Sequence, residues 1–209
     1  MKKEERLLLA AKKLQEMKLF EEALYQSGCL YIAGTDEVGR GPLAGPVVAA
    51  AVILPREFNV LGVDDSKKVT EKKRGELFEI LKDCALSYGI GIVDNETIDR
   101  INILQASKLA MKLAVAQLHP QPDHLLVDAM RLEDIDLEQT GIIHGDGRSV
   151  TIAAASIIAK VTRDRMMQDY HRIYDCYAFD SNKGYGTQAH YEGIRKHGLC
   201  PIHRKSFVK

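Results

Sequence analysis

An uninterrupted apolar run, Val47–Leu54, follows a glycine-rich turn and ends at Pro55. Its length and its β-branched residues predict a buried strand. The segment before the turn, residues 27–37, also has the composition of a strand. This part of the chain therefore predicts a strand–turn–strand unit, and that order limits what the turn between the strands can do.

The turn Gly39–Ala44 reads Gly-Arg-Gly-Pro-Leu-Ala, which fits the G-x-G-x-x-G/A pattern of a dinucleotide-binding loop. Such a loop binds pyrophosphate because it opens a helix, whose N-terminal amides receive the phosphates. Here a strand follows the glycines, and the carboxylates of Asp36 and Glu37 precede them. No G-x-x-x-x-G-K-[ST] loop occurs elsewhere. The sequence therefore disfavours a nucleotide cofactor.

The remaining pattern alternates strands with helices and predicts one α/β domain around a mixed sheet. A charged segment, residues 3–25, carries apolar residues at helical spacing and predicts an amphipathic helix that docks on the body or on a partner. We assign residues 1–27 to this N-terminal extension and residues 28–209 to the catalytic domain. Further helices are expected at 71–86, with inward Leu77, Ile80, Leu81 and Leu86, and at 101–118, 149–170 and 188–197; further strands are expected at 87–93, 124–129 and 140–146.

Composition is that of a soluble globular protein, with 45% hydrophobic residues and no net charge over 209 residues. The four cysteines show no C-x-x-C spacing, and the N-terminal apolar run of five residues is shorter than the roughly 7–15 that a signal peptide needs. We therefore expect a cytoplasmic protein with reduced thiols, no membrane span and a monomeric state.

Charge is unevenly distributed along the chain. Residues 128–146 hold six acids and a single arginine, whereas residues 181–209 hold six Lys or Arg and a single acid. An acidic centre beside a basic tail suits a metal site next to a polyanion. The alternative explanation is that the two segments form solvated protein surfaces of opposite charge.

Two further acids, Asp128 and Asp146, end strand-like segments, and open α/β sheets place their sites at the carboxyl ends of strands. Together with Asp36 and Glu37 they form an all-oxygen donor set that suits Mg²⁺ or Mn²⁺. Neighbours in a strand point to opposite faces, so Asp36 and Glu37 require a bulge or a strand end, which the flanking Gly34 and Gly39 permit. The alternative is that the four acids are unrelated surface residues.

Several residues are candidates for contact with a nucleic acid. Arg40 lies between two glycines, where the backbone can approach a nucleotide and the guanidinium can bind phosphate. Ser66 and Lys67 lie in a loop suited to a phosphate contact, and Tyr185 lies in a flexible basic loop where it can stack on a sugar or base. Each has a simpler explanation: a solvated turn arginine, a solvated lysine pair with Lys68, and a tyrosine packed on the surface.

Taken together, these motifs resemble the ribonuclease HII family, the type 2 ribonucleases H, over about residues 30–208. The resemblance rests on "GTDEVGRGPLAGPVVAAAVIL" and "GDGRSVTIAAASIIAKVTRDR", with shorter matches at "DDSKKVTEKKR", "IDRINILQAS", "LLVDAM", "NKGYGT" and "HRKSF". It implies a ribonuclease H-like five-stranded mixed sheet flanked by helices, with a C-terminal helical segment over the substrate. It also implies endonucleolytic cleavage of RNA paired with DNA and of single ribonucleotides embedded in duplex DNA.

By position, the resemblance implies two divalent cations, Mn²⁺ or Mg²⁺, held by Asp36, Glu37, Asp128 and Asp146. It implies that Gly39, Arg40 and Gly41 read the 2′-hydroxyl and hold the scissile phosphate, and that Tyr185 stacks on the sugar. Cleavage on the 5′ side of the ribonucleotide leaves 3′-hydroxyl and 5′-phosphate ends. The chain departs from many relatives at Gly147 and in its N-terminal helix. A hybrid-binding protein without catalysis and a nuclease that acts on DNA alone are the two alternatives.

Overall fold

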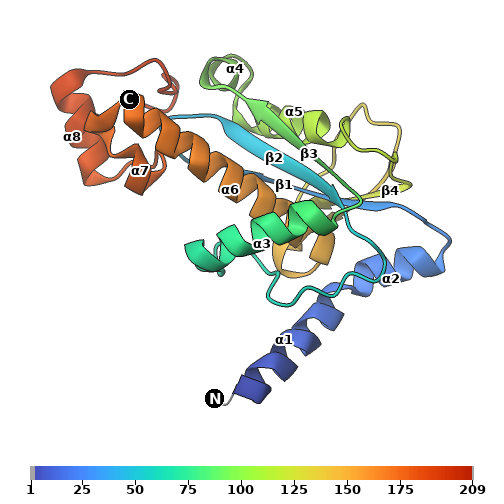
Figure 1. Cartoon of the computed structure of the whole chain (residues 1–209). Helices are drawn as coiled ribbons and strands as arrows, with labels where there is room; N and C mark the ends of the chain where they lie inside the picture. The colour runs from blue at the N-terminus through green and yellow to red at the C-terminus, as the bar shows by residue number, and fades with distance from the viewer. Residues whose placement is uncertain (1–2, 209) are drawn as a thin grey trace.

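The computed structural model describes residues 3–208 and shows a twisted sheet with helices on both faces (Figure 1). The sheet has five strands in the order β3-β2-β1-β4-β5. Their bounds are β1 Ile32–Val38, β2 Val47–Ile53, β3 Ser87–Val93, β4 His124–Asp128 and β5 Glu138–Ile142. The mixed five-stranded sheet expected from the resemblance is confirmed.

The strand–turn–strand prediction is also confirmed. β1 pairs antiparallel with β2 in an unbroken register from Ala33↔Ile53 to Val38↔Val48. β1 pairs on its other side with β4, in parallel, and β5 continues the parallel half of the sheet. The carboxyl ends of β1 and β4 therefore lie at the same edge.

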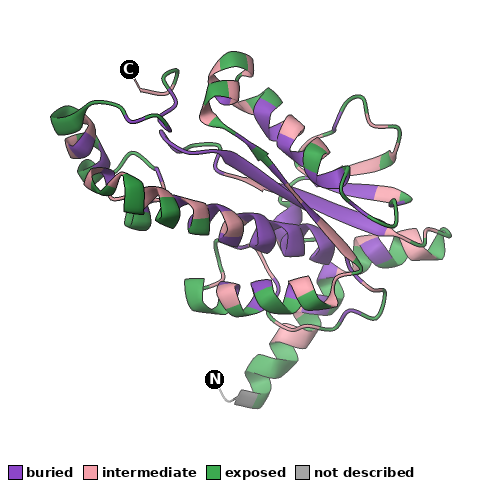
Figure 2. Ribbon diagram, turned by 45° about the horizontal axis from the view of Figure 1, so that its top comes forward, coloured by how far each residue is buried: buried purple, intermediate pink, exposed green. Residues whose placement is uncertain are grey.

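The helix α6, Val150–Ile173, crosses one face of the sheet and is buried over most of the length that covers the strands (Figure 2). Glycine permits this approach: a Cβ at Gly34 in β1 would lie 2.3 Å from the backbone carbonyl carbon of Thr151. The helix α3, Glu71–Cys84, packs outside α6, and its N-cap Thr70 accepts a hydrogen bond from the Lys73 amide. The helix α5, Ile103–Val115, covers the opposite face of the sheet.

Two helix predictions are corrected by the structure. Residues 3–25 form two helices, α1 Lys3–Met17 and α2 Leu19–Gln26, and α1 projects away from the sheet (Figure 1). The bend lets Leu14 and Met17 pack in one core cluster while Phe20 and Leu24 pack against another. The helix expected at 101–118 is α5 alone, which starts at Ile103 and follows the separate helix α4, Asn95–Ile101, because Asn102 at φ +66° ends one helix and caps the next.

The expectation for α3 is correct for Leu77 and Leu81, which are buried, and wrong for Ile80 and Leu86, which are 40% and 50% exposed. α3 buries only the side that faces α6, and Leu86 lies beyond the helix. The C-terminal segment holds α7, Phe179–Asn182, and α8, Gln188–His197, and packs at the far end of α6 around a small core of its own (Figure 1). Within residues 3–208, no helix combines the length and hydropathy needed to cross a membrane.

Candidate active site

Three of the four predicted acids meet at the carboxyl ends of β1 and β4. The parallel register pairs Thr35 with Val127, so Asp36 and Asp128 are the next residues on adjacent strands. Glu37 follows Asp36, whose Oδ1 accepts a hydrogen bond from the Glu37 amide at 2.7 Å. The strand order thus brings together residues that lie about ninety positions apart in the chain.

Asp146 joins this group from a different element than expected. β5 ends at Ile142, and Asp146 lies in a short 3-10 helix, η1 Gly145–Gly147, that leads into α6. The chain turns there because His144 adopts a left-handed conformation at φ +57°. The Gly145 amide donates to Oδ1 of Asp128 at 2.7 Å, which ties the turn to the end of β4.

The expected bulge at Asp36 and Glu37 is wrong, since the pairing of β1 with β2 runs through both residues. The expected strand end is correct: both acids lie in the last three residues of β1, beyond its pairing with β4. Gly34 serves helix packing, whereas Gly39, at φ +96°, starts the turn. At these two residues β1 no longer pairs with β4. Asp36 and Glu37 therefore reach one site although neighbours in a strand point to opposite faces.

Electrostatic repulsion is strong among these carboxyls. Burial, followed by the charges of Glu37 and Asp128, raises the pKa of Asp36 well above its ordinary value. Burial also raises the pKa of Glu37 and of Asp146, and the charge of Asp128 adds to both shifts. A raised carboxyl pKa means that the site disfavours its own ionised form and gains from an added positive charge.

The chemistry of this donor set suits hard divalent cations. The site offers carboxylate oxygens only, and Oε2 of Glu37 is buried without a hydrogen-bond partner. Within residues 3–208, however, no three acidic, histidine or cysteine side chains enclose a site as they stand. As they stand, the acids contact other groups: Asp128 accepts from the Gly145 amide, Glu37 lies 3.4 Å from Arg40, and Asp146 lies 3.9 Å from Lys67.

Lys67 and Ser66 flank the acids in different ways. The Lys67 ammonium is exposed, and although burial opposes the shift, the charges of Asp146 and Asp65 raise its pKa. The Ser66 side chain is buried, and its hydroxyl bonds that of Ser156 on α6 at 2.8 Å. Ser156 also counteracts the rise in the pKa of Asp36, so Ser66 contacts a residue that adjoins the acid site. Direct contact of Ser66 with a phosphate remains a prediction.

Arg40, Gly41 and Tyr185 lie together beside the acids. Arg40 and Gly41 are exposed, and a Cβ at Gly41 would lie 3.5 Å from Cε1 of the Tyr185 ring. Tyr185 is 45% exposed for a large aromatic side chain. The Leu43 amide donates to the Gly184 carbonyl at 2.8 Å, which joins the two loops. An aromatic ring, an arginine and bare backbone therefore share one surface with the carboxylates.

Sequence reasoning did not identify three residues that shape the site. Ser156 reads as one more small residue of α6, and Arg163 and Arg204 lie in charged segments that are typical of surfaces. The structure buries both arginines completely under the turn at residues 39–46. The only signal for the three residues was the resemblance, whose motif "GDGRSVTIAAASIIAKVTRDR" contains Ser156 and Arg163 and whose motif "HRKSF" contains Arg204.

Comparison with solved structures defines the class of protein first. The ribonuclease H2 of Pyrococcus horikoshii OT3 superposes with a TM-score of 0.68 at 27% identity, over 86% of this chain and 94% of that one. The RNase HII of Archaeoglobus fulgidus, solved in a complex with PCNA, gives 0.72 at 26% identity, over 86% and 96%. Bst-RNase HIII, solved with Mn²⁺, shares the fold with a TM-score of 0.68 at 23% identity, over 89% and 70%. The chain thus has the ribonuclease H-like fold.

Sequence comparison then identifies the family. The family model described as Ribonuclease HII matches residues 33–209. A Ribonuclease HII of Acetivibrio thermocellus is 57% identical over 93% of this chain and 76% of its own length, and one of Listeria innocua is 55% identical over 99% and 78%. The chain belongs to the ribonuclease HII family. It is a ribonuclease H, a hydrolase of RNA–DNA substrates, and this favours catalysis over the hybrid-binding alternative.

Proposed function

We propose that this enzyme cuts the RNA strand of RNA–DNA hybrids and also cuts on the 5′ side of single ribonucleotides embedded in duplex DNA, leaving 3′-hydroxyl and 5′-phosphate ends. The observation that carries the proposal is the shared surface of Gly41, Tyr185 and the acids of β1 and β4. A surface that holds one sugar against an aromatic ring and bare backbone can test that sugar for a 2′-hydroxyl beside the reacting phosphate.

Asp36, Glu37, Asp128 and Asp146 would hold two divalent cations, Mn²⁺ or Mg²⁺. Bound there, the cations would neutralise charge on the phosphodiester and activate water for in-line displacement. Their donor chemistry supports this role, as does the repulsion that raises the pKa values of Asp36, Glu37 and Asp146. For the four acids to bind the cations together, Asp146 must exchange its contact with Lys67 for a contact with a cation.

The remaining residues bind and orient the substrate. Gly39, Arg40 and Gly41 contact the 2′-hydroxyl and the scissile phosphate, and Tyr185 stacks on the ribose at the RNA–DNA junction. Lys67 is free to neutralise a neighbouring phosphate once Asp146 turns away from it. Ser66 accepts a hydrogen bond from Ser156 and supports the acid site from behind.

We assign residues 1–27 to an extension and residues 28–209 to the catalytic domain of a cytoplasmic monomer. The family match begins at residue 33, which supports the boundary.

The decisive experiment offers three duplexes of one sequence: an RNA–DNA hybrid, a DNA duplex with one ribonucleotide, and all-DNA. We expect cleavage of the first two in Mg²⁺ or Mn²⁺, with the second cut once, 5′ of the ribonucleotide. Mapping of the product ends by gel electrophoresis gives the cut position. Equal cleavage of the all-DNA duplex would defeat the 2′-hydroxyl proposal and favour the DNA nuclease alternative.

A further inference from the structure

Two arginines from distant parts of the chain donate hydrogen bonds to backbone carbonyls of the turn between β1 and β2. Arg204 near the C-terminus donates from Nε to Gly45 O at 2.9 Å, from Nη1 to Arg40 O at 3.0 Å and from Nη2 to Gly39 O at 2.6 Å. Arg163 of α6 donates from Nε to Pro46 O at 2.9 Å, from Nη2 to Ala44 O at 3.2 Å and from Nη1 to Lys183 O at 2.9 Å. Each guanidinium nitrogen thus has one carbonyl acceptor.

Both side chains are fully buried, and the nearest acids are committed to other partners. Asp164 pairs with Lys160 at 2.6 Å and with Arg74 at 3.7 Å, and Asp99 accepts from the amides of Lys205 and Ser206. Burial lowers the pKa of Arg163 to about 10 and that of Arg204 to about 9, so both remain cations at neutral pH. Burying two cations without carboxylates is costly, so the arrangement requires an explanation beyond packing.

The geometry of the peptide bond supplies that explanation. In a trans peptide the carbonyl and the following N–H point in opposite directions. Because the Gly39 and Arg40 carbonyls point inward to Arg204, the amides of Arg40 and Gly41 point outward, on the exposed side of the turn. Among the described residues, neither amide has a hydrogen-bond acceptor, whereas the Leu43 and Gly45 amides donate to Gly184 and Ile202. Successive outward amides form a site for an anionic oxygen.

Two glycines, one in the turn and one in the Tyr185 loop, lie where a side chain would not fit. A Cβ at Gly39 would lie 2.2 Å from Nε of Arg163, and one at Gly184 would lie 2.5 Å from the Ala44 carbonyl oxygen. The bond from Arg163 to Lys183 O also fixes the loop that carries Tyr185. Arg163 therefore joins the turn to the Tyr185 loop, whereas Arg204 bonds the turn alone.

We propose that Arg163 and Arg204 are positioning residues: Arg204 draws in the Gly39 and Arg40 carbonyls so that the Arg40 and Gly41 amides face the substrate, and Arg163 holds the Tyr185 loop against that surface through Lys183. This role rests on the proposed function of the turn as the 2′-hydroxyl and phosphate reader. The two arginines touch no substrate themselves.

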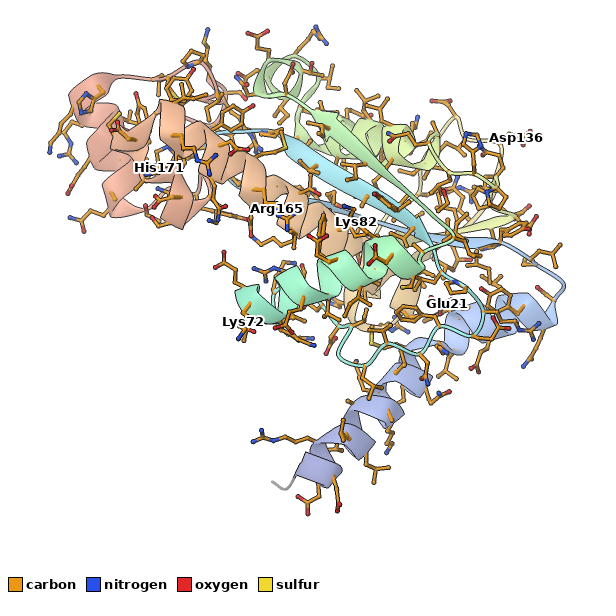
Figure 3. The ribbon with its side chains drawn as sticks, in the orientation of Figure 1. Glu21, Lys72, Lys82, Asp136, Arg165 and His171 are labelled. Atoms are coloured by element: carbon orange, nitrogen blue, oxygen red, sulfur yellow. The ribbon has the colours of Figure 1, made fainter. Side chains whose placement is uncertain are left out.

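The test replaces each arginine by lysine, which keeps the charge but has one nitrogen in place of the planar fork. Arg204→Lys and Arg163→Lys are prepared in the full chain that also carries Asp128→Asn, so that binding is measured without cleavage. Arg165→Lys is the matched control, because Arg165 lies on the same helix, is exposed and bonds Glu79 of α3 (Figure 3). Melting curves confirm that each protein is folded at the assay temperature.

The readout is the ratio of dissociation constants for the all-DNA duplex and the single-ribonucleotide duplex in Mg²⁺. We expect this ratio to fall by about tenfold or more in both lysine variants, because the loop loses most of the carbonyl hydrogen bonds that orient it. Arg165→Lys keeps the ratio. A purely structural role would lower the melting temperature and leave the ratio within twofold, and that result overturns the proposal.

Amide hydrogen exchange in the unmodified protein tests the same idea without a variant. The Arg40 and Gly41 amides should exchange much faster than those of Leu43 and Gly45 and should become protected when the single-ribonucleotide duplex is bound. Protection of Arg40 and Gly41 in the free protein overturns the proposal. If the Asp128→Asn parent itself does not distinguish the two duplexes, the proposed function fails, and failure of the arginine role is therefore seen separately.

Discussion

The acid site and the arginine-held turn are adjacent, and each buries several groups of one charge sign. They differ in whether the protein itself supplies hydrogen-bond partners for those groups. Arg163 and Arg204 have a backbone carbonyl for each nitrogen, so the turn is complete in the protein alone. The acids share few donors, repel one another, and leave Oε2 of Glu37 without a partner. A buried charge satisfied by backbone dipoles organises structure, whereas one left unsatisfied is poised for an incoming cation.

Breaking the acid site should have the largest effect. Asp128→Asn removes a carboxylate charge but keeps an acceptor at the position that the Gly145 amide contacts. We expect kcat on the single-ribonucleotide duplex to fall by about 10³-fold or more while binding persists. Single-turnover cleavage and a binding titration measure the two quantities. Full residual activity would remove Asp128 from the proposed mechanism.

The next effect concerns the support of Asp146 by the N-terminal extension. Glu21 of α2 is buried, and its Oε1 accepts from the Ser149 hydroxyl at 2.6 Å, the Thr151 hydroxyl at 2.8 Å and the Thr151 amide at 3.1 Å (Figure 3). These donors lie at the start of α6, directly after η1. Glu21→Ala removes the acceptor that these three donors share and should cost about 2–4 kcal/mol of folding free energy.

Chemical denaturation measures that change, with Glu22→Ala as the control. Glu22 is the exposed neighbour on the same helix, so its replacement should change stability by less than about 0.5 kcal/mol. Equal effects of the two substitutions would show that the Glu21 contacts contribute nothing specific.

A cation should stabilise the acid site and leave the turn unchanged. At about one hundred times its dissociation constant, Mg²⁺ or Mn²⁺ contributes about 2.7 kcal/mol, or a rise of about 5–10 °C in melting temperature for a chain of this size. Calorimetry in EDTA and in millimolar cation measures the shift. Identical melting in both buffers would count against the acids as a metal site.

The smallest effect follows from the raised pKa of Asp36. An acid whose folded pKa exceeds its unfolded pKa stabilises the fold below the unfolded pKa, and this contribution is lost as the pH rises through the folded pKa. In EDTA at neutral pH, Asp36→Asn should therefore be more stable than the parent, and the difference should vanish towards pH 4. Melting curves across that pH range test the sign, and a less stable variant at pH 7 contradicts it.

The site was predictable where chemistry follows from local order. The strand–turn–strand unit disfavours a dinucleotide-binding loop, and Asp128 at the end of an apolar segment indicates a site at the sheet edge. The apolar residues Ile142 and Ile143 extend the pattern of β5 and predict a strand that reaches Asp146. His144 turns the chain instead, and the bond from Gly145 to Asp128 that accompanies this turn joins residues 17 positions apart.

The N-terminal segment and the two arginines show the limit of sequence patterns. Helical spacing over residues 3–25 predicts amphipathic character correctly, but the bend at Lys18 depends on two separate core clusters that the segment must reach. Arg163 and Arg204 have the composition of surface residues, because their acceptors are backbone carbonyls that carry no side-chain signature.

The sequence by itself determined the strands, the acids and the family, because periodicity, strand ends and motif spacing are local properties of the chain. Tertiary structure alone decided that Glu21 supports the start of α6 and that two buried cations orient the turn. The physical reason is that these contacts join residues more than one hundred positions apart. Their energy comes from donors and carbonyls that meet only when the fold closes.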